Sequence, residues 1–242
     1  MAILIFFILH WYISLFCQSF FLHRYAAHRM FTMSPFWEKS FFIISGFAQG
    51  SSYLSPYVYG VLHRMHHAFA DTEQDPHSPK YSKGVFGMMW KTWIVYSSIK
   101  KGSAEVEPRF QKDVPRWDKF DRIPDSWVVR LLFAAFYVWF YVEFATQWWM
   151  FLLLPIHFFM GPVHGVIINW FAHKIGYTNF KVKDTSVNLL PVDFLMLGEA
   201  YHNNHHKHST NPNFGKRWFE IDPVFPVVRI FHFLGIIKVA KA

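Results

Sequence analysis

The histidines of this sequence are the residues that most directly predict chemistry, because 15 of them occur in 242 residues. Nine fall in four short groups: HRYAAH at 23–28, HRMHH at 63–67, NWFAH at 169–173 and HNNHH at 202–206. The spacing i, i+3, i+4 in two of these groups places three imidazoles on one face of a helix, about one turn apart. Such an arrangement is typical of metal ligands.

Neutral imidazole is the commonest metal ligand in proteins, and it suits iron, zinc, copper and nickel. Nine rings exceed the four ligands of one tetrahedral ion, so the sequence predicts two metal ions, each with an open position. The expected ligands are His23, His28, His63, His66, His67, His173, His202, His205 and His206. Three nearby polar residues, Asp75, His77 and Glu199, are expected to orient the ligating rings.

The other histidines and the single cysteine carry weaker signals. His10, His157 and His232 stand alone among apolar residues and are interpreted as packing residues, while His164 and His208 stay open. Cys17 excludes a disulfide framework and lies in an apolar stretch, where it is expected to be inert. The motifs HExxH, GxGxxG, GxSxG and the P-loop are absent, and Glu-x-x-His occurs only once, at 199–202.

The composition indicates how these groups are positioned. The chain is 52% apolar, 21% aromatic and only 17% charged. All 24 lysines and arginines lie in 23–130 and 174–242, which is the distribution expected if both segments are cytoplasmic. The net charge of +8 accompanies apolar spans, so it favours contact with an anionic membrane surface over nucleic-acid binding.

Three apolar segments are long enough to cross a membrane: 2–22, 128–146 and 148–172. The first lacks a basic start and a small-residue cleavage site, which argues for a retained span and against a signal peptide. The other two predict a hairpin that turns near Gln147, with a kink from Pro155 and Pro162.

The composition of the segments between the spans predicts how each of them is structured. Residues 36–62 are expected to form a helix pair at the membrane interface, because a crossing there would separate the histidine groups. Residues 100–127 resemble a solvated connector. The fold prediction is an all-α integral membrane protein, a single domain over 1–242, with three transmembrane helices and an external N-terminus. A helical cytoplasmic cap, residues 23–127 and 173–242, would hold the di-metal centre.

The motifs also resemble those of a known family. HRYAAH, HRMHH, NWFAH and HNNHH are similar to the histidine motifs of membrane fatty acyl desaturases of the stearoyl-CoA type. LHRMHHAFADTEQDPHSP resembles the family stretch HRxHHxxxxxxxDPH, and GEAYHNNHH resembles GExxHNxHH. The resemblance extends from about residue 15 to 235, most of the chain.

The resemblance implies two iron ions that use dioxygen as co-substrate to introduce a cis double bond, of the delta-9 type, into a long acyl chain. It also implies that the nine histidines bind the iron ions directly and that Asn169 is a further ligand, which binds through a water molecule. Electrons would come from a separate ferredoxin or small b-type cytochrome with its reductase, docked on the basic face. The implied location is a multi-pass protein of a bacterial inner membrane, with the site on the cytoplasmic face.

Two departures from the family pattern concern the substrate and the spans. Acyl-CoA-using members carry arginine two residues before the second motif, where this chain has Val61. The sequence therefore leaves acyl-CoA and acyl-lipid substrates open. Animal members carry a further span before the first motif, and this chain has 22 residues there.

Two alternative functions stay open at this point. A di-iron membrane hydroxylase of a lipid substrate would use the same histidines and would yield a hydroxyl instead of a double bond. A membrane metal or haem carrier would instead use the histidines within the spans, His10, His157 and His164.

Overall fold

The computed structural model describes residues 1–239 and is mostly helical. Its first helix, α1 (Ala2–Phe16), continues without a break into a π-helical segment, η1 (Cys17–Ala27). Together they form one 26-residue apolar helix, Ala2–Ala27, that is long enough to cross a membrane. The predicted first span therefore extends further than residue 22 and includes the first histidine of HRYAAH.

The chain then forms two helices, α2 (Pro35–Gln49) and α3 (Pro56–Phe69), joined by a short 3-10 turn, η2 (Gly50–Ser52). Each has proline as its first residue, a position where the missing N–H is no loss. The Ser34 side chain caps α2 by accepting a hydrogen bond from Trp37 N. The helix pair was predicted, but α3 extends beyond residue 62 and carries the whole HRMHH motif.

A longer helix and two short ones follow: α4 (Gly84–Lys101), α5 (Pro108–Gln111) and α6 (Asp118–Asp121). Helix α4 ends at Gly102, whose φ of 68° is the left-handed conformation that closes many helices. The connector 100–127 is largely exposed, as predicted, although Phe110 and Val114 pack into an apolar cluster with α3 and α4.

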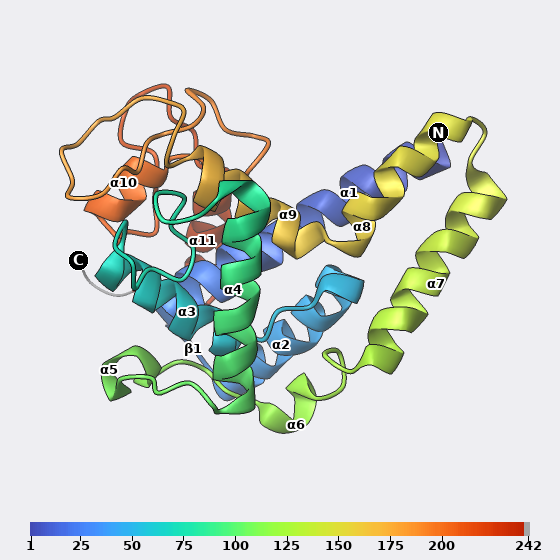
Figure 1. The fold of residues 1–242 in the computed structure, drawn as a ribbon, viewed down its shortest axis with the longest axis horizontal. Coiled ribbons are helices and arrows are strands. Elements are labelled where there is room, and N and C mark those ends of the chain that lie inside the picture. Colours follow the sequence, from blue (N-terminus) through green and yellow to red (C-terminus); the bar gives the residue numbers. More distant parts are fainter. Residues whose placement is uncertain (240–242) are drawn as a thin grey trace.

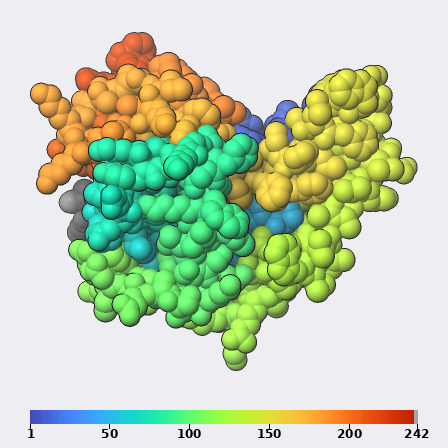
Figure 2. Space-filling view, in the orientation of Figure 1, coloured from blue at the N-terminus to red at the C-terminus, as the bar shows by residue number. Residues whose placement is uncertain are grey.

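The second membrane-length helix is α7 (Trp127–Phe144), which begins at the capping residue Ser126. Most of its surface is exposed and apolar, as expected of a helix in contact with lipid. In Figure 2, α7 and the neighbouring α8 form an arm that stands apart from the green and orange parts of the molecule.

The predicted third span is a bent pair of helical segments. Residues Trp148–Phe158, comprising η3 (Trp148–Leu153) and α8 (Leu154–Phe158), meet Met160–Phe171, comprising α9 (Met160–Val166) and η4 (Ile167–Phe171), at 81°. Pro162 lies four residues after Phe158 and cannot bond its carbonyl. Ser51 Oγ bonds that carbonyl at 3.1 Å, and Gly161 N bonds Ser52 Oγ at 3.0 Å, so the bend leaves these groups paired. The predicted kink is confirmed.

The remaining elements are α10 (His202–Lys207), α11 (Val224–Phe233) and two short strands, β1 (Phe31–Met33) and β2 (Ile237–Val239). The strands pair antiparallel, with Thr32 opposite Lys238. The mostly helical fold agrees with the all-α prediction, and this two-stranded pair is an addition to it; three-residue strands about 200 residues apart leave no periodic signal in the sequence. Figure 1 shows α3, α10 and α11 at one end of the molecule, while α1, α7 and α8 project from the other.

Candidate metal centre

The nine predicted ligand histidines converge from four segments and divide into two groups. The first group comprises His23, His28, His63, His67 and His205. The second group comprises His66, His173, His202 and His206. Within each group the candidate ligand atoms all lie within 4.8 Å of one another, so each group could hold one ion.

Helices α3 and α10 each contribute to both groups. The i, i+4 pair of α3, His63 and His67, belongs to the first group, while His66 between them faces the second. Helix α10 is arranged the other way, with the outer residues of its motif in the second group and His205 in the first. The two adjacent histidines of each motif therefore belong to different groups.

The π-helical end of the first span explains how HRYAAH can supply two ligands. A π-helical turn bonds residue i to i+5, and the backbone N of His28 bonds the carbonyl of His23 at 3.1 Å. The two rings consequently lie near each other, with centroids 5.0 Å apart. Helix α3 packs closely on this segment and brings His63 to the two rings. Gly60 permits the close approach, because a Cβ atom at this position would lie only 3.2 Å from the carbonyl oxygen of Ala26.

The Nε2 atoms of the first group form a chain of close contacts. The order is His28, His63, His67, His205, His23, and the successive Nε2–Nε2 distances are 2.9, 3.0, 2.9 and 3.0 Å. Each imidazole nitrogen has either one hydrogen or one lone pair, so at most two of these four contacts can be hydrogen bonds. A shared cation resolves the conflict. Nitrogens bound at right angles to one ion, with bonds of about 2.1 Å, would lie about 3.0 Å apart.

The second group shows the same deficit of partners. His173 Nε2 and His202 Nε2 lie 3.0 Å apart. The Nε2 atoms of His66 and His206 are buried and have no hydrogen-bond partner among the described residues. Buried polar atoms are rarely left unpaired in folded proteins. Four nitrogens that lie close together, two of them without a hydrogen-bond partner, fit a metal ion.

The opposite nitrogens of several rings are held by polar side chains. His66 Nδ1 lies 3.0 Å from both carboxylate oxygens of Asp75, and His206 Nδ1 lies 2.9 Å from Asp184. In the first group, His23 Nδ1 lies 2.6 Å from Glu199. A carboxylate at Nδ1 fixes the ring so that Nε2 is the metal-binding atom, and it increases the basicity of the ligand.

The electrostatics keep the rings in the form that binds metal. Burial, followed by repulsion from neighbouring rings, lowers the pKa of four ligands well below the ordinary value: His63, His67, His202 and His205. Burial alone would raise the pKa of Asp75, but His66 overcomes this effect and lowers it to about 2. These four rings are therefore neutral, and the Asp75 carboxylate is ionised, at neutral pH.

Residues 1–231 match the sequence model of a known family, described as fatty acid desaturase. The chain belongs to the fatty acid desaturase family. Among curated relatives, sn-1 stearoyl-lipid 9-desaturase of Synechocystis sp. is 31% identical over 90% of this chain and 65% of its own length. The sn-1 stearoyl-lipid 9-desaturase of Anabaena variabilis is 29% identical over 88% of this chain and 74% of its own length. Acyl-CoA 5-desaturase AL21 of Anemone leveillei is 26% identical over 88% of this chain and 64% of its own length.

The predicted family is thus confirmed, and the activities named for the first two relatives agree with the predicted function, a fatty acyl desaturase of the delta-9 type. This chain spans just under two thirds of the Synechocystis protein and about three quarters of the Anabaena protein. The names of the three relatives include both lipid-linked and CoA-linked substrates.

The residues that were predicted to orient the ligand histidines lie next to those histidines in the structure. Asp75 contacts His66, and it also accepts hydrogen bonds from the backbone N of Asp71 and of His77, both at 3.0 Å. The ring of His77 is buried 4.4 Å from the ring of His66, measured between centroids. Asn169 has no hydrogen bond to any described residue, so its role as a ligand through water stays a prediction.

The sequence did not reveal three further residues around the second group. Asp184 holds His206, and Thr185 Oγ1 lies 3.3 Å from His173 Nδ1. Asp71 accepts hydrogen bonds from Thr185 N and Oγ1 at 2.6 and 2.7 Å. These residues lie on irregular loops that fold back onto the histidines, and no fixed spacing in the sequence indicates such partners.

Arg24, inside the first motif, was also missed. It is fully buried, with Nη1 3.0 Å from Glu199 Oε1 and Nη2 2.7 Å from Asp222 Oδ2. Its guanidinium lies 3.9 Å from the centre of the Phe214 ring. Arg24 therefore neutralises and positions the carboxylate that holds His23, and it attaches the first span to the C-terminal part of the chain.

Four further histidines, His10, His157, His164 and His208, lie outside both groups. His10 Nδ1 and His157 Nδ1 lie 2.7 Å apart between α1 and α8, and His164 Nδ1 lies 3.1 Å from Gln18 Oε1. His208 is exposed, and none of these rings joins either group. The packing interpretation of His10 and His157 agrees with their burial, whereas His232 is exposed, so the interpretation is wrong for that residue.

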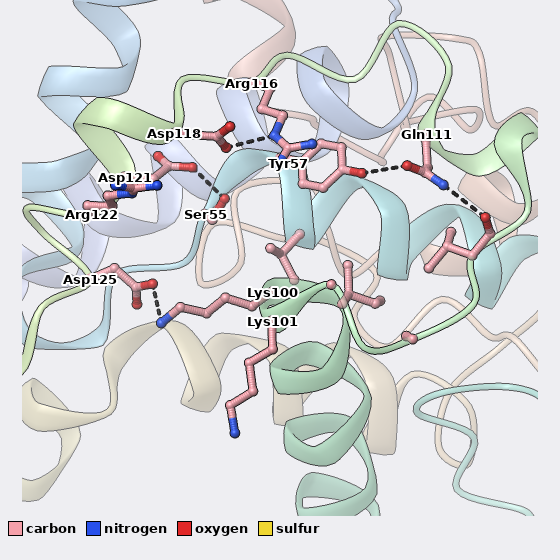
Figure 3. A pocket seen from close by; sticks show the side chains of 15 residues that line it. Ser55, Tyr57, Lys100, Lys101, Gln111, Arg116, Asp118, Asp121, Arg122 and Asp125 are labelled. Carbon is pink, nitrogen blue, oxygen red and sulfur yellow. Dashed lines mark hydrogen bonds and ion pairs between the residues drawn. The ribbon is translucent and has the colours of Figure 1, made fainter.

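A pocket of about 450 Å³ lies away from the histidines, between α6 and the C-terminal end of α4 (Figure 3). Its charged side chains are largely paired: Lys100 with Asp125, and Arg116 with Asp118. Asp121 accepts hydrogen bonds from Tyr53 and Ser55, both at 2.6 Å. These pairs connect α3, α4 and the connector, which is a structural role.

Proposed function

We propose that this chain is an oxygen-dependent desaturase that forms a cis double bond of the delta-9 type in a long acyl chain, with one iron ion in each histidine group. The observation that carries the proposal is the division of nine histidines, in a chain of the desaturase family, into five and four with their Nε2 atoms facing one another. All of these ligand atoms are nitrogens, and imidazole suits iron among the redox metals.

Side chains alone cannot remove hydrogen from an unactivated methylene. The iron pair, when bound, would supply that oxidising chemistry with dioxygen as co-substrate. The chain's own residues would hold the rings neutral, aim Nε2 through Asp75, Asp184 and Glu199, and keep water away by burying the ligands. Asn169 is proposed as a water-mediated ligand, since it lies four residues before His173.

The reaction consumes two electrons and two protons in addition to the two hydrogens of the substrate, and dioxygen becomes two waters. We infer that the electrons come from another protein, because the one cysteine of these 242 residues, Cys17, is a buried thiol in the first span. An iron–sulfur cluster needs several cysteines. We therefore include a separate ferredoxin or small b-type cytochrome, with its reductase, in the proposal.

We propose a membrane glycerolipid as the carrier of the acyl chain, ahead of coenzyme A. Val61, at the position where acyl-CoA-using members carry arginine, is fully buried in an apolar cluster with Val58 and Leu62. The relatives named as lipid 9-desaturases support the same choice. The apolar helices α1 and α7 would hold the enzyme in the membrane, with the histidine groups at the cytoplasmic face of a bacterial inner membrane.

Expression in a cell without its own delta-9 desaturase tests the proposal. Mass spectrometry of the fatty acids should reveal new monounsaturated chains, with the double bond at carbon 9, in lipid extracts. His208→Ala, a histidine outside both groups, is the matched control for His66→Ala, which should give no product. Hydroxylated chains in place of unsaturated ones would support the hydroxylase, and equal product from His66→Ala would refute the metal centre.

A further inference from the structure

A basic pocket opens beside the first histidine group. Its lining comprises Ala27, His28, Arg29, Arg64, Arg109, Lys112 and Asp113. Four of these residues are cationic and one is a carboxylate. The pocket lies where the end of η1 meets α3 and the segment around α5, and His28 is both part of its lining and a predicted ligand.

The positive charge of this pocket is largely uncompensated. Among the described residues, neither Arg29, Arg64 nor Lys112 forms an ion pair with a carboxylate, and Arg109 pairs with Glu107 at 2.7 Å. Arg64 instead donates to backbone carbonyls, including that of Ala27 at 2.6 Å. An anionic partner would compensate these charges.

The backbone at the pocket is strained at Arg29, the residue directly after His28. Arg29 has φ of 52°, a left-handed conformation that a residue with a side chain rarely adopts. The strained turn comes directly after His28, whose Nε2 lies 2.9 Å from His63 Nε2. His28 is partly exposed, whereas His23, His63 and His205 are buried. One imidazole therefore separates the pocket from the predicted ion of the first group.

We propose that this pocket is the docking site for an acidic one-electron carrier protein and that electrons enter the first histidine group through His28. The inference rests on the proposed function, in which two electrons from a reduced donor and two protons are needed for each dioxygen converted to two waters. Complementary charge would steer the donor to the pocket and orient it there.

A phosphate of the lipid headgroup is the other anion with suitable chemistry, and the geometry disfavours it. A headgroup bound against His28 would place the start of the acyl chain next to a metal ligand. The carbons that undergo delta-9 desaturation lie far along the chain, so they would be carried past the centre. An electron carrier, in contrast, gains from the short path to the ion.

The test uses the full-length iron-loaded protein in lipid nanodiscs with a reduced acidic [2Fe–2S] ferredoxin as the probe. Lys112→Glu changes an exposed side chain, and Lys101→Glu is the matched control at an exposed lysine outside the pocket. We expect Lys112→Glu to raise the KM for ferredoxin about tenfold at low salt, with kcat nearly unchanged, and the effect to shrink as ionic strength rises. Lys101→Glu should retain the wild-type KM.

A single turnover reduced chemically by dithionite bypasses the donor, so Lys112→Glu should then form as much product as the wild type. An unchanged KM for ferredoxin, or an equal loss with dithionite, would overturn the docking site. A raised KM for the acyl lipid would overturn it in favour of a headgroup site. If the wild type forms no double bond even with dithionite, the proposed function fails instead.

A second variant protects the test against misfolding. Arg29→Gln removes one pocket charge without reversing it, and its folding can be checked by the iron content of the purified protein. We expect a smaller increase in the KM for ferredoxin than with Lys112→Glu, about threefold, because one charge is removed instead of inverted. Normal iron content with a wild-type KM would count against the proposal.

Discussion

The two histidine groups differ in how their rings are held. The first has five rings, and among the described residues only His23 has a carboxylate, Glu199, at its Nδ1 atom. The second has four rings, of which His66 and His206 contact carboxylates and His173 contacts Thr185 beside Asp71. To bind a metal ion, the first group would therefore depend on its larger number of imidazole rings. The second group has fewer rings and would depend on the carboxylates that orient and polarise them.

This difference predicts unequal tolerance to change. Removing one ring leaves four nitrogens in the first group but three in the second. Removing an orienting carboxylate should matter more in the second group, where the anions compensate for the missing ring. Paired substitutions in the two groups can therefore distinguish the effect of the number of imidazole rings from the effect of the carboxylates that orient them.

Loss of a ligand should give the largest effect, and it should differ between the groups. His66→Ala leaves three rings in the second group, so we expect no detectable unsaturated product and about one iron per protein instead of two. His28→Ala leaves four rings in the first group and should retain most of its iron. Elemental analysis of both purified proteins, with His208→Ala as the control, checks this; equal iron loss in both would remove the distinction.

Neutralising an orienting carboxylate of the second group should come next. Asp184→Asn keeps the size of the side chain but removes the charge at His206 Nδ1, and we expect iron affinity or activity to fall about 10- to 100-fold. Asp118→Asn, at an exposed aspartate paired with Arg116, is the matched control. Competition with an iron chelator measures the affinity, and wild-type retention of iron by Asp184→Asn would contradict the interpretation.

The corresponding change in the first group should be milder. Glu199→Gln weakens the support of His23, but four other rings remain, so we expect a loss of about tenfold, the lower end of the range for such residues. The same chelator assay applies. A larger loss than in Asp184→Asn would reverse the comparison, and a concurrent fall in thermal stability would indicate that the buried pair with Arg24 had also been broken.

The smallest effect is expected from a neutral partner. Thr185→Val removes the hydroxyl that donates to Asp71 and lies near His173 Nδ1, while it keeps the branched shape. One hydrogen bond contributes about 1 kcal/mol, so activity should fall about fivefold. Product formation under saturating donor and substrate provides the measurement, and a loss as large as that of Asp184→Asn would show that charge is not the deciding property.

The convergence of the nine histidines was predictable because their spacing is regular. HRMHH and HNNHH have helical spacing, and both lie on helices in the structure. The bend in the third span followed from Pro162, and DPH indicated Asp75. What the sequence could not reveal is the assignment of rings to groups, because whether His66 belongs to a different group from His63 and His67 depends on where α10 and the other segments lie around α3.

The missing parts share one physical cause, which is contact between segments distant in sequence. Asp184 reaches His206 from a loop, Arg24 reaches Asp222 across 198 residues, and β1 pairs with β2. None of these contacts repeats with a period along the chain. The predicted first span also ended too early, because it stopped at the polar residues His23 and Arg24, through which the helix continues to Ala27.

The sharing of α3 and α10 between the two groups has a consequence for assembly. An ion bound in one group fixes the backbone that presents rings to the other, so the first ion to arrive should increase affinity for the second, and the reverse must hold equally. Titration of the apoprotein with ferrous iron should then pass from empty to fully loaded protein with few singly loaded molecules. Under iron limitation, a cell would hold a mixture of fully competent and inert copies instead of a uniformly impaired pool.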